Sequence, residues 1–258
     1  MAFHIIICIK SVITRAPREK VVRSSDSCEL NPFDRPALEV ALRLKDDFNG
    51  SVTALSMGPE SCAFALHEAM AMGVDQGVLL CDPALSGSDT LATSTALGAA
   101  IRKLSPFDLV LFGVRTADSD TGQVGPETAV FLDLPLVTGV HSIQKQDPGL
   151  RVDRRADRFE EAYALSLPAA LTVHPAAAKP RDAGLRGIED AYNQGKITVW
   201  ALEDVGLSPD QVGEKGSPTR LLSLTPAKKG RKCAYLSGSA EEQADALVKR
   251  LADSGLII

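Results

Sequence analysis

The sequence predicts an α/β protein built on a doubly wound, mostly parallel sheet. In the first half of the chain, short apolar runs rich in β-branched residues alternate with longer segments of helical period. The short runs are apolar at successive positions, which is typical of strands that are covered on both faces. With 258 residues, 45% of them hydrophobic, the chain can bury a core without disulfides or a structural metal.

Five strands are expected from the apolar runs. They are Phe3–Ile9, Val52–Ser56, Gly77–Cys81, Leu109–Gly113 and Leu136–Val140. Three segments of helical period lie between them, over residues 34–48, 60–72 and 89–104. This alternation predicts that each helix crosses from one parallel strand to the next.

The pattern changes after residue 145. Leu150–Arg155 and Arg158–Leu165 predict a small antiparallel hairpin, about 145–165, that decorates the sheet, and Ala169–Val173 predicts another strand. The segment 175–195 is rich in Ala, Pro, Gly and charged residues, which predicts a long exposed loop leading into a short helix.

The C-terminal part predicts an extended arm and a final helix. Leu207–Lys232 carries three prolines and a basic cluster at 228–232, a pattern that a solvated linker also explains. Ser239–Ser254 has an apolar face, with Ser239 as the N-cap and Glu242 at the third helical position. We therefore divide the chain into an α/β domain, residues 1–205, and a C-terminal arm and helix, residues 206–258.

Charge and cysteine usage argue against several classes of protein. The formal net charge of −5 provides no general attraction for nucleic acid or anionic lipid, and no apolar run approaches the roughly 18 residues of a membrane span. The five cysteines are scattered without metal-ligand spacing, so we expect free thiols and a reducing, cytoplasmic location. We expect no nucleic-acid partner, no direct membrane insertion and no metal site.

The segment 113–127 directly follows a predicted strand and is the strongest candidate for a ligand site. Its glycines and small hydroxyl residues let the backbone approach a ligand, and the amides that open the next helix favour an anion such as phosphate. It matches neither the Walker loop nor the GxGxxG fingerprint, and a long turn with an aspartate cap explains the spacing equally well. The turns at 31–34, 57–59 and 89–90 should meet it at the same sheet edge, with Asp34 as a helix cap.

No catalytic group stands out in the sequence. The four histidines are far apart, the acidic pairs are typical of solvated faces, and no cysteine has the basic surroundings that activate a thiolate. A nucleotide-binding α/β chain without such groups suggests binding, carriage or assembly of a shared site. We assign no catalytic residue.

Several blocks match one known family, in order, along nearly the whole chain. They are Cys8–Lys10, Asn31–Asp34 with Ala37–Lys45, Val52–Pro59, Glu68–Asp75, Asp89–Thr93, Asp118–Glu127 and Ser166–Thr172. Together these blocks resemble the β (small) subunit of electron transfer flavoproteins. The resemblance implies an adenine-nucleotide-binding, Rossmann-like domain, and an electron-carrier subunit rather than a stand-alone enzyme.

The resemblance also implies partners and cofactors. Such a subunit pairs with an α subunit that holds FAD in a mobile domain, and the heterodimer carries electrons from an acyl-CoA-type dehydrogenase to a quinone reductase or other redox acceptor. The β chain binds a second nucleotide, which is AMP in single-electron carriers and FAD in the branch that bifurcates electrons from NADH. Asp120–Pro126 resembles the bifurcating branch more closely, which favours FAD.

Carried over position by position, the resemblance implies these nucleotide-binding residues: Cys8, Ile9, Lys10, Asn31, Ser56, Met57, Asp89, Thr93, Gly113, Asp118, Ser119, Asp120, Thr121, Gly122, Gln123 and Val124. Phe33 would face the flavin of the α subunit. A recognition loop over 178–191 would dock the dehydrogenase, with Leu185 as the apolar anchor beside Arg186 and Ile188. Glu161 would contact the moving flavin domain, and residues 206–258 would pack on the α subunit.

Two segments depart from the family, and two other hypotheses remain. Glu189–Gln194 is acidic and polar where the family has a lysine-rich run, which leaves the dehydrogenase open. Ser11–Pro17 replaces a Val-Pro-Asp turn near the nucleotide, which leaves bifurcation open.

Two other functions are alternatives to this interpretation. They are a nucleotide-sensing module of the universal-stress type without an α partner, and an adenylating or nucleotide-hydrolysing enzyme. The second would need a P-loop or a metal-binding carboxylate pair, and the sequence shows neither clearly.

Overall fold

The structure is a computed structural model that describes residues 3–14, 27–193, 195, 197–223 and 233–257. The chain divides into two compact units, residues 1–224 and residues 225–258.

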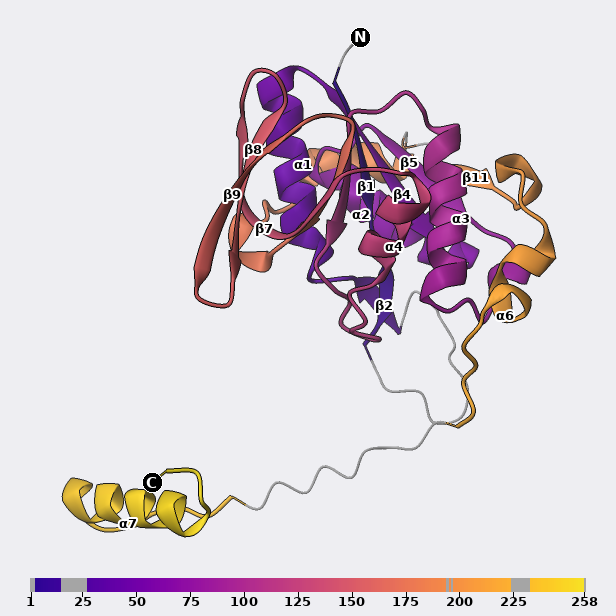
Figure 1. The fold of residues 1–258 in the computed structure, drawn as a ribbon. Helices are drawn as coiled ribbons and strands as arrows, with labels where there is room; N and C mark the ends of the chain where they lie inside the picture. The colour runs from indigo at the N-terminus through magenta and orange to yellow at the C-terminus, as the bar shows by residue number, and fades with distance from the viewer. Residues whose placement is uncertain (1–2, 15–26, 194, 196, 224–232, 258) are drawn as a thin grey trace. The chain divides into compact units, whose positions relative to one another are not determined.

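The first unit is built on a nine-stranded sheet with the strand order β11-β5-β4-β1-β6-β10-β7-β8-β9 (Figure 1). Its strands are β1 (His4–Cys8), β4 (Ser51–Met57), β5 (Gln76–Leu80), β6 (Leu109–Gly113), β7 (Leu136–Lys145), β8 (Leu150–Ala156), β9 (Phe159–Leu165), β10 (Ala169–Val173) and β11 (Ile197–Trp200). Neighbours from β11 to β7 pair in parallel, and β8 and β9 pair antiparallel. A separate antiparallel pair is formed by β2 (Ser11–Ile13) and β3 (Cys28–Leu30).

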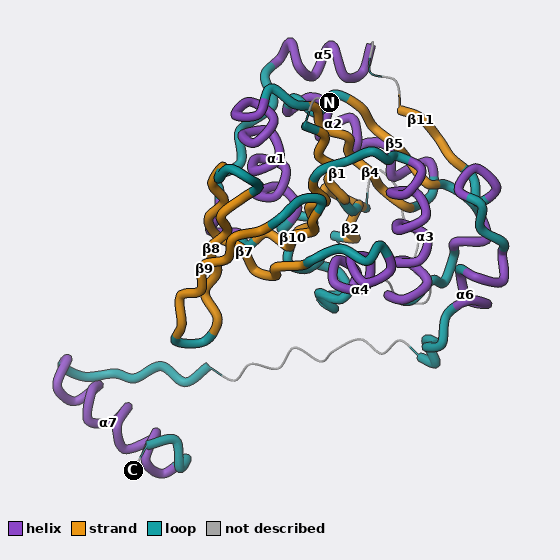
Figure 2. The backbone as a smooth tube through the Cα atoms, turned by 45° about the horizontal axis from the view of Figure 1, so that its top comes forward, coloured by secondary structure: helices purple, strands orange, loops and turns teal. Residues whose placement is uncertain are grey.

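Helices cover both faces of this sheet (Figures 1 and 2). They are α1 (Asp34–Phe48), α2 (Ala63–Met72), α3 (Thr90–Lys103), α4 (Val124–Phe131), α5 (Leu185–Asn193) and α6 (Gly213–Gly216), with short 3-10 turns at Glu60–Cys62, Pro83–Leu85, Pro175–Ala177, Glu203–Val205 and Pro209–Gln211. Because side chains alternate along a strand, Ile5 and Ile7 pack in one core with α1 and α2, whereas Ile6 packs in a second core with α3 and α4. The predicted doubly wound α/β fold is confirmed.

The predicted antiparallel hairpin is confirmed, but its strands belong to the main sheet and are not an addition outside it. β7 runs to Lys145, beyond the predicted end at Val140, and pairs with β8, so the hairpin extends the sheet. β11 and the β2–β3 pair were not predicted from the sequence. They are only three or four residues long, which is too short to show a clear alternation of apolar residues in the sequence. β11 forms by pairing with β5, and β2 and β3 pair with each other.

The predicted short helix after the exposed loop is α5, which begins at Leu185, inside the predicted recognition loop 178–191. The predicted arm does not begin at Leu207, because Val212 is buried and Gly213 donates its N–H to Ser88 Oγ at 2.9 Å. Gly213 has a φ of +65°, and a Cβ there would lie 1.9 Å from the Ala84 carbonyl oxygen, so only glycine suits this position.

The second unit contains α7 (Ala240–Asp253). Ser239 caps α7 and forms the predicted capping box with Glu242. Leu247 and Val248 on this helix are about half exposed, at 49% and 55%. Among the residues that the structure describes, no helix combines the length and apolar character that a membrane crossing requires.

Candidate functional site

The candidate site lies at the carboxyl ends of the central strands. After β1 the chain builds β4 and β5 on one side, and then crosses to place β6 on the other side of β1. Open α/β sheets bind ligands at such a reversal of strand order. Cys8, Ser56 and Gly113 lie at the ends of β1, β4 and β6, so the fold gathers these three predicted segments at one edge.

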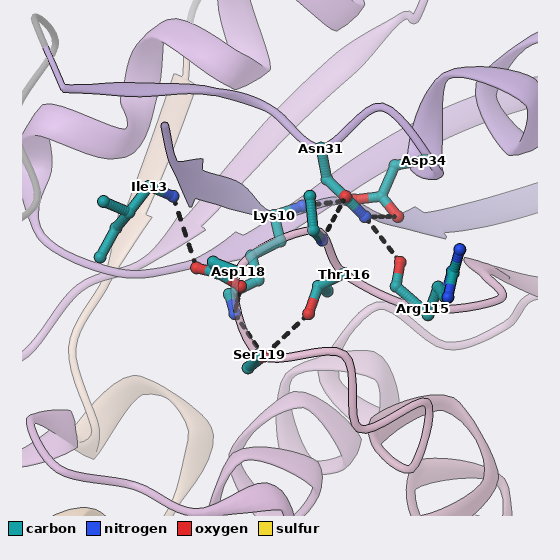
Figure 3. Close-up of polar contacts among 9 residues, drawn as sticks. Lys10, Ile13, Asn31, Asp34, Arg115, Thr116, Asp118 and Ser119 are labelled. Atoms are coloured by element: carbon teal, nitrogen blue, oxygen red, sulfur yellow. Dashed lines mark hydrogen bonds and ion pairs between the residues drawn. The ribbon is translucent and has the colours of Figure 1, made fainter. Parts of the chain in front are cut away.

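Asn31 joins the loop before α1 to the loop after β6 (Figure 3). Its side-chain Nδ2 donates to Asp34 Oδ1 at 2.8 Å and to the Arg115 carbonyl oxygen at 2.9 Å, and its Oδ1 accepts from the Ala117 N–H at 3.2 Å. Asn31 is completely buried, and both amide hydrogens are used. Its side chain therefore holds the two loops together beneath the rim of the site.

Asp34 was predicted to cap α1, and this prediction is wrong. Phe33 is the N-cap residue and makes no side-chain cap. The Asp34 carboxylate instead accepts the N–H of Lys10, at 2.8 Å, and the side-chain amide of Asn31, and Gly113 packs directly against it. Burial raises the pKa of Asp34 to about 7, even though these hydrogen bonds favour the charged form. Asp34 thus ties α1 to the ends of β1 and β6.

Lys10 provides a cation at the rim of this edge. Its ammonium contacts Asp118 Oδ1 at 2.7 Å and Ser119 Oγ at 3.2 Å, and its side chain is one-third exposed. Asp118 also accepts from the Ile13 N–H at 3.4 Å, and the hydroxyls of Ser119 and Thr116 are 2.8 Å apart. An ammonium group beside hydroxyls is suited to bind a phosphate oxygen.

The loop from Arg115 to α4 turns back over Phe33. The Arg115 guanidinium lies 4.5 Å from the centre of the Phe33 ring and pairs with Asp120 at 3.3 Å. Asp120 and Gly122 both have positive φ, +51° and +64°. These left-handed conformations turn the chain just before α4 begins at Val124. Within the described residues no side chain caps α4 at Gln123, so its first amides remain available to an anion.

Cys8, Ser56 and Met57 contribute the less polar part of the edge. Burial, and secondarily the nearby Asp34 carboxylate, raises the pKa of the Cys8 thiol, so Cys8 packs as a neutral group. Ser56 Oγ is buried and has no hydrogen-bond partner within the described part of the chain. An unpaired buried hydroxyl costs about 1–3 kcal/mol, and a ligand that bonds to it would remove that cost.

Asp89 lies at the start of α3, but its carboxylate is already occupied. One oxygen caps α3 through the Ala92 N–H at 3.0 Å, and the other accepts the N–H and hydroxyl of Thr219. Burial acts to raise the pKa of Asp89, but these hydrogen bonds hold it below its usual value. The link to Thr219 was missed because nothing local in the sequence relates two residues so far apart.

Thr93 follows Asp89 in the first turns of α3, beside the start of α4. Glu127 of α4 accepts hydrogen bonds from Thr90 at 3.1 Å and from Ser94 at 3.2 Å. These bonds align the first turns of α3 and α4. Sequence reasoning did not assign this role to Glu127.

The residues predicted to dock partners lie on other elements. Leu185, Ile188 and Tyr192 follow one side of α5 and are 89%, 41% and 57% exposed. Arg186 is exposed and lies 3.7 Å from Asp190. These side chains form an exposed apolar stripe on a helix rather than on a loop.

Glu161 lies on β9, in the hairpin. Its Oε2 accepts hydrogen bonds from Arg154 Nε and from the Tyr163 hydroxyl. The Arg154 hydrogen bond, followed by that of Tyr163, lowers the pKa of Glu161, so this carboxylate is held charged. The structure therefore places Glu161 apart from the network at the strand ends.

A cavity of about 510 Å³ lies elsewhere, where Gln76 and Thr198 mark the starts of β5 and β11. It is therefore at the opposite edge of the sheet from the candidate site. The described residues contain no group of three or more potential metal ligands, and none of the five cysteines, each in a described segment, forms a disulfide.

Comparison with known proteins agrees with this arrangement. Residues 19–205 match the family model described as an electron transfer flavoprotein domain. The chain is 36% identical to an electron transfer flavoprotein subunit beta from Thermoanaerobacterium thermosaccharolyticum, over 90% of this chain and 88% of that protein. It is 39% identical to the caffeyl-CoA reductase–Etf complex subunit CarD from Acetobacterium woodii, over 92% and 91%. It is 36% identical to the acryloyl-CoA reductase electron transfer subunit gamma from Anaerotignum propionicum, over 98% and 100%. The chain therefore belongs to the electron transfer flavoprotein family, as a relative of its β subunits.

Proposed function

We propose that this chain is the β subunit of a heterodimeric electron transfer flavoprotein. It binds an adenine nucleotide at the carboxyl ends of β1, β4 and β6 and docks an acyl-CoA-type dehydrogenase. Electrons then pass through an FAD held by the α subunit to a quinone reductase or another redox acceptor. The observation that carries the proposal is the bonded network of Lys10, Asn31, Asp34 and the loop after Gly113 at the reversal of strand order.

The residues at this edge fit a nucleotide. Lys10, Ser119 and the uncapped start of α4 would hold phosphate oxygens, and Gly122 lets the backbone come close to them. The unpaired Ser56 hydroxyl would bond to the nucleoside part beside Met57. Bound FAD would supply the redox chemistry, whereas this chain would bind and orient it.

FAD is favoured over AMP as the nucleotide of this chain. The segment Asp120–Pro126 resembles the bifurcating branch of the family. Two relatives are named as parts of a caffeyl-CoA reductase–Etf complex and of an acryloyl-CoA reductase. Those names support a partner that acts on CoA thioesters, and we include electron bifurcation in the proposed role of the complex.

The remaining predicted residues receive roles at the interfaces. Leu185, with Arg186 and Ile188, would enter the dehydrogenase from α5, and Glu161 would contact the moving flavin domain. Phe33, beneath Arg115, would face the flavin of the α subunit. The half-exposed Leu247 and Val248 of α7 would be covered by the α subunit.

Co-purification tests the assembly. We expect the chain, expressed together with an electron transfer flavoprotein α subunit, to elute from a sizing column as a yellow heterodimer. A colourless homodimer that forms whether or not the α subunit is present would contradict the proposal. That result would favour a nucleotide-sensing module instead.

A further inference from the structure

The helix α5 is attached to the body of the protein with little apolar burial. Of its described residues only Ala191 is buried. It lies against α2, where a Cβ on Gly187 would be 2.4 Å from the Ala71 carbonyl oxygen (Figure 2). Small residues thus allow close contact but supply little hydrophobic free energy. Polar contacts at the two ends of α5 must therefore determine how firmly it is held.

The first of these contacts precedes α5 and involves Arg181, four residues before Leu185. The Glu39 carboxylate on α1 has only 6% exposure and accepts from Arg181 three times, through the backbone N–H at 3.2 Å, Nε at 2.8 Å and Nη2 at 3.3 Å. Arg43 donates to the same carboxylate at 2.8 Å. Burial acts to raise the pKa of Glu39, but the hydrogen bonds from Arg181 and Arg43 hold it below its usual value.

The second contact is at the end of α5. The His67 ring on α2 stacks on the Tyr192 ring, with centroids 4.7 Å apart, and its Nδ1 lies 3.0 Å from the Ala191 carbonyl oxygen. Stacking between two rings allows them to shift relative to one another. By contrast, a guanidinium that meets a buried carboxylate through two nitrogens has one preferred geometry.

We propose that the Glu39–Arg181 ion pair is a positioning device that holds α5 with its apolar stripe already in the docking orientation. This inference rests on the proposed function, in which Leu185 on that stripe enters the dehydrogenase. A helix that is ordered before binding loses less conformational entropy when the complex forms. The ion pair therefore strengthens docking without touching the partner, and Arg181 and Glu39 are positioning residues.

Hydrogen exchange of the complete heterodimer tests the first half of the inference. In Arg181→Ala we expect the amides of α5 to exchange about tenfold faster than in the wild type, while those of β1 and α3 are unchanged. Arg181→Lys keeps the charge but loses the fork geometry and should give a smaller increase. Arg155→Ala is the matched control, because it breaks the exposed Arg155–Glu160 pair on the hairpin. Unchanged exchange of α5 in Arg181→Ala would overturn the inference.

Reduction by an acyl-CoA dehydrogenase tests the second half. Arg181→Ala should raise the KM for the heterodimer about tenfold and leave kcat and bound nucleotide unchanged, with Arg181→Lys in between. If Leu185→Ala raises KM but Arg181→Ala does not, the positioning role is wrong while docking by α5 stands. If Leu185→Ala has the wild-type KM, docking by α5 is itself wrong. The two failures are therefore distinguishable.

Discussion

Gly113, the last residue of β6, lies directly against the carboxylate of Asp34, the first residue of α1. A Cβ on Gly113 would lie 2.2 Å from Asp34 Oδ1 and 2.6 Å from the Phe33 carbonyl oxygen. This close approach fixes the distance between the loop before α1 and the loop that we assign to phosphate binding. The geometry of the site thus depends on the close fit between Gly113 and a buried carboxylate.

Gly113→Ala should therefore destabilise the protein and weaken nucleotide binding. Because the added methyl group must displace Asp34 or the Phe33 backbone, we expect a loss of about 1–3 kcal/mol in the free energy of unfolding. Gly184→Ala is the control, since no described neighbouring atom lies within 4 Å of its added Cβ. Urea denaturation of both variants checks the prediction, which fails if the two lose equal stability.

Asp34 should make the stability of the protein depend on pH. Its pKa is raised from 3.8 to about 7 by burial, so the folded state favours the protonated form. The corresponding stability is fully present below about pH 4 and is lost as the pH rises through about 7. Since one pKa unit corresponds to 1.36 kcal/mol, the loss is at most about 4 kcal/mol.

Asp34→Asn provides the comparison, because asparagine does not titrate. Unfolding free energies measured at pH 4 and pH 8 should show that the advantage of the wild type over this variant is smaller at pH 8. An advantage that is the same at both pH values would show that Asp34 keeps its usual pKa in the folded protein.

Lys10 should contribute directly to nucleotide affinity. In Lys10→Met the ammonium that lies beside Ser119 is lost, and we expect the dissociation constant for ADP to rise about tenfold in calorimetric titrations of the nucleotide-free heterodimer. Lys45→Met is the matched control, because Lys45 pairs with Asp75 away from this edge. Equal ADP affinities of the two variants would remove Lys10 from the site.

Leu185 should matter for the dehydrogenase and not for the nucleotide. Removing this 89% exposed side chain with Leu185→Ala should raise the KM for the heterodimer at least tenfold, because full burial of a leucine contributes about 1.5–3 kcal/mol. Val130→Ala removes another exposed apolar side chain, from α4, and should leave KM unchanged. If Leu185→Ala releases nucleotide instead, the docking role is wrong.

The sequence predicted the sheet well because the evidence for it is local. Ile5, Ile6 and Ile7 form an unbroken apolar run because both faces of β1 are covered by helices, and the helical period over 89–104 correctly predicts α3. The Asn31–Asp34 segment, before a predicted helix, and the glycine at 113, at the end of a predicted strand, could likewise be assigned to one sheet edge.

What could not be predicted depends on contacts between distant residues. Asp34 was predicted to cap α1 because aspartate before a helix usually does so, yet the N–H of Lys10 and the side-chain amide of Asn31 occupy its carboxylate. Glu39 and Arg181 are 142 residues apart, and neither stands out among the other charged residues. Their pairing arises because the segment before α5 folds back against α1, and no local sequence pattern indicates that return.

The central claim is that the edge formed by β1, β4 and β6 holds an adenine nucleotide. Its most direct test is to denature the purified complex with the α subunit and to count the released nucleotides by chromatography and absorbance. Two FAD per heterodimer are predicted, one from each subunit. One FAD with one AMP would keep the site but overturn the preference for FAD, and a single FAD with no second adenine nucleotide would contradict the claim.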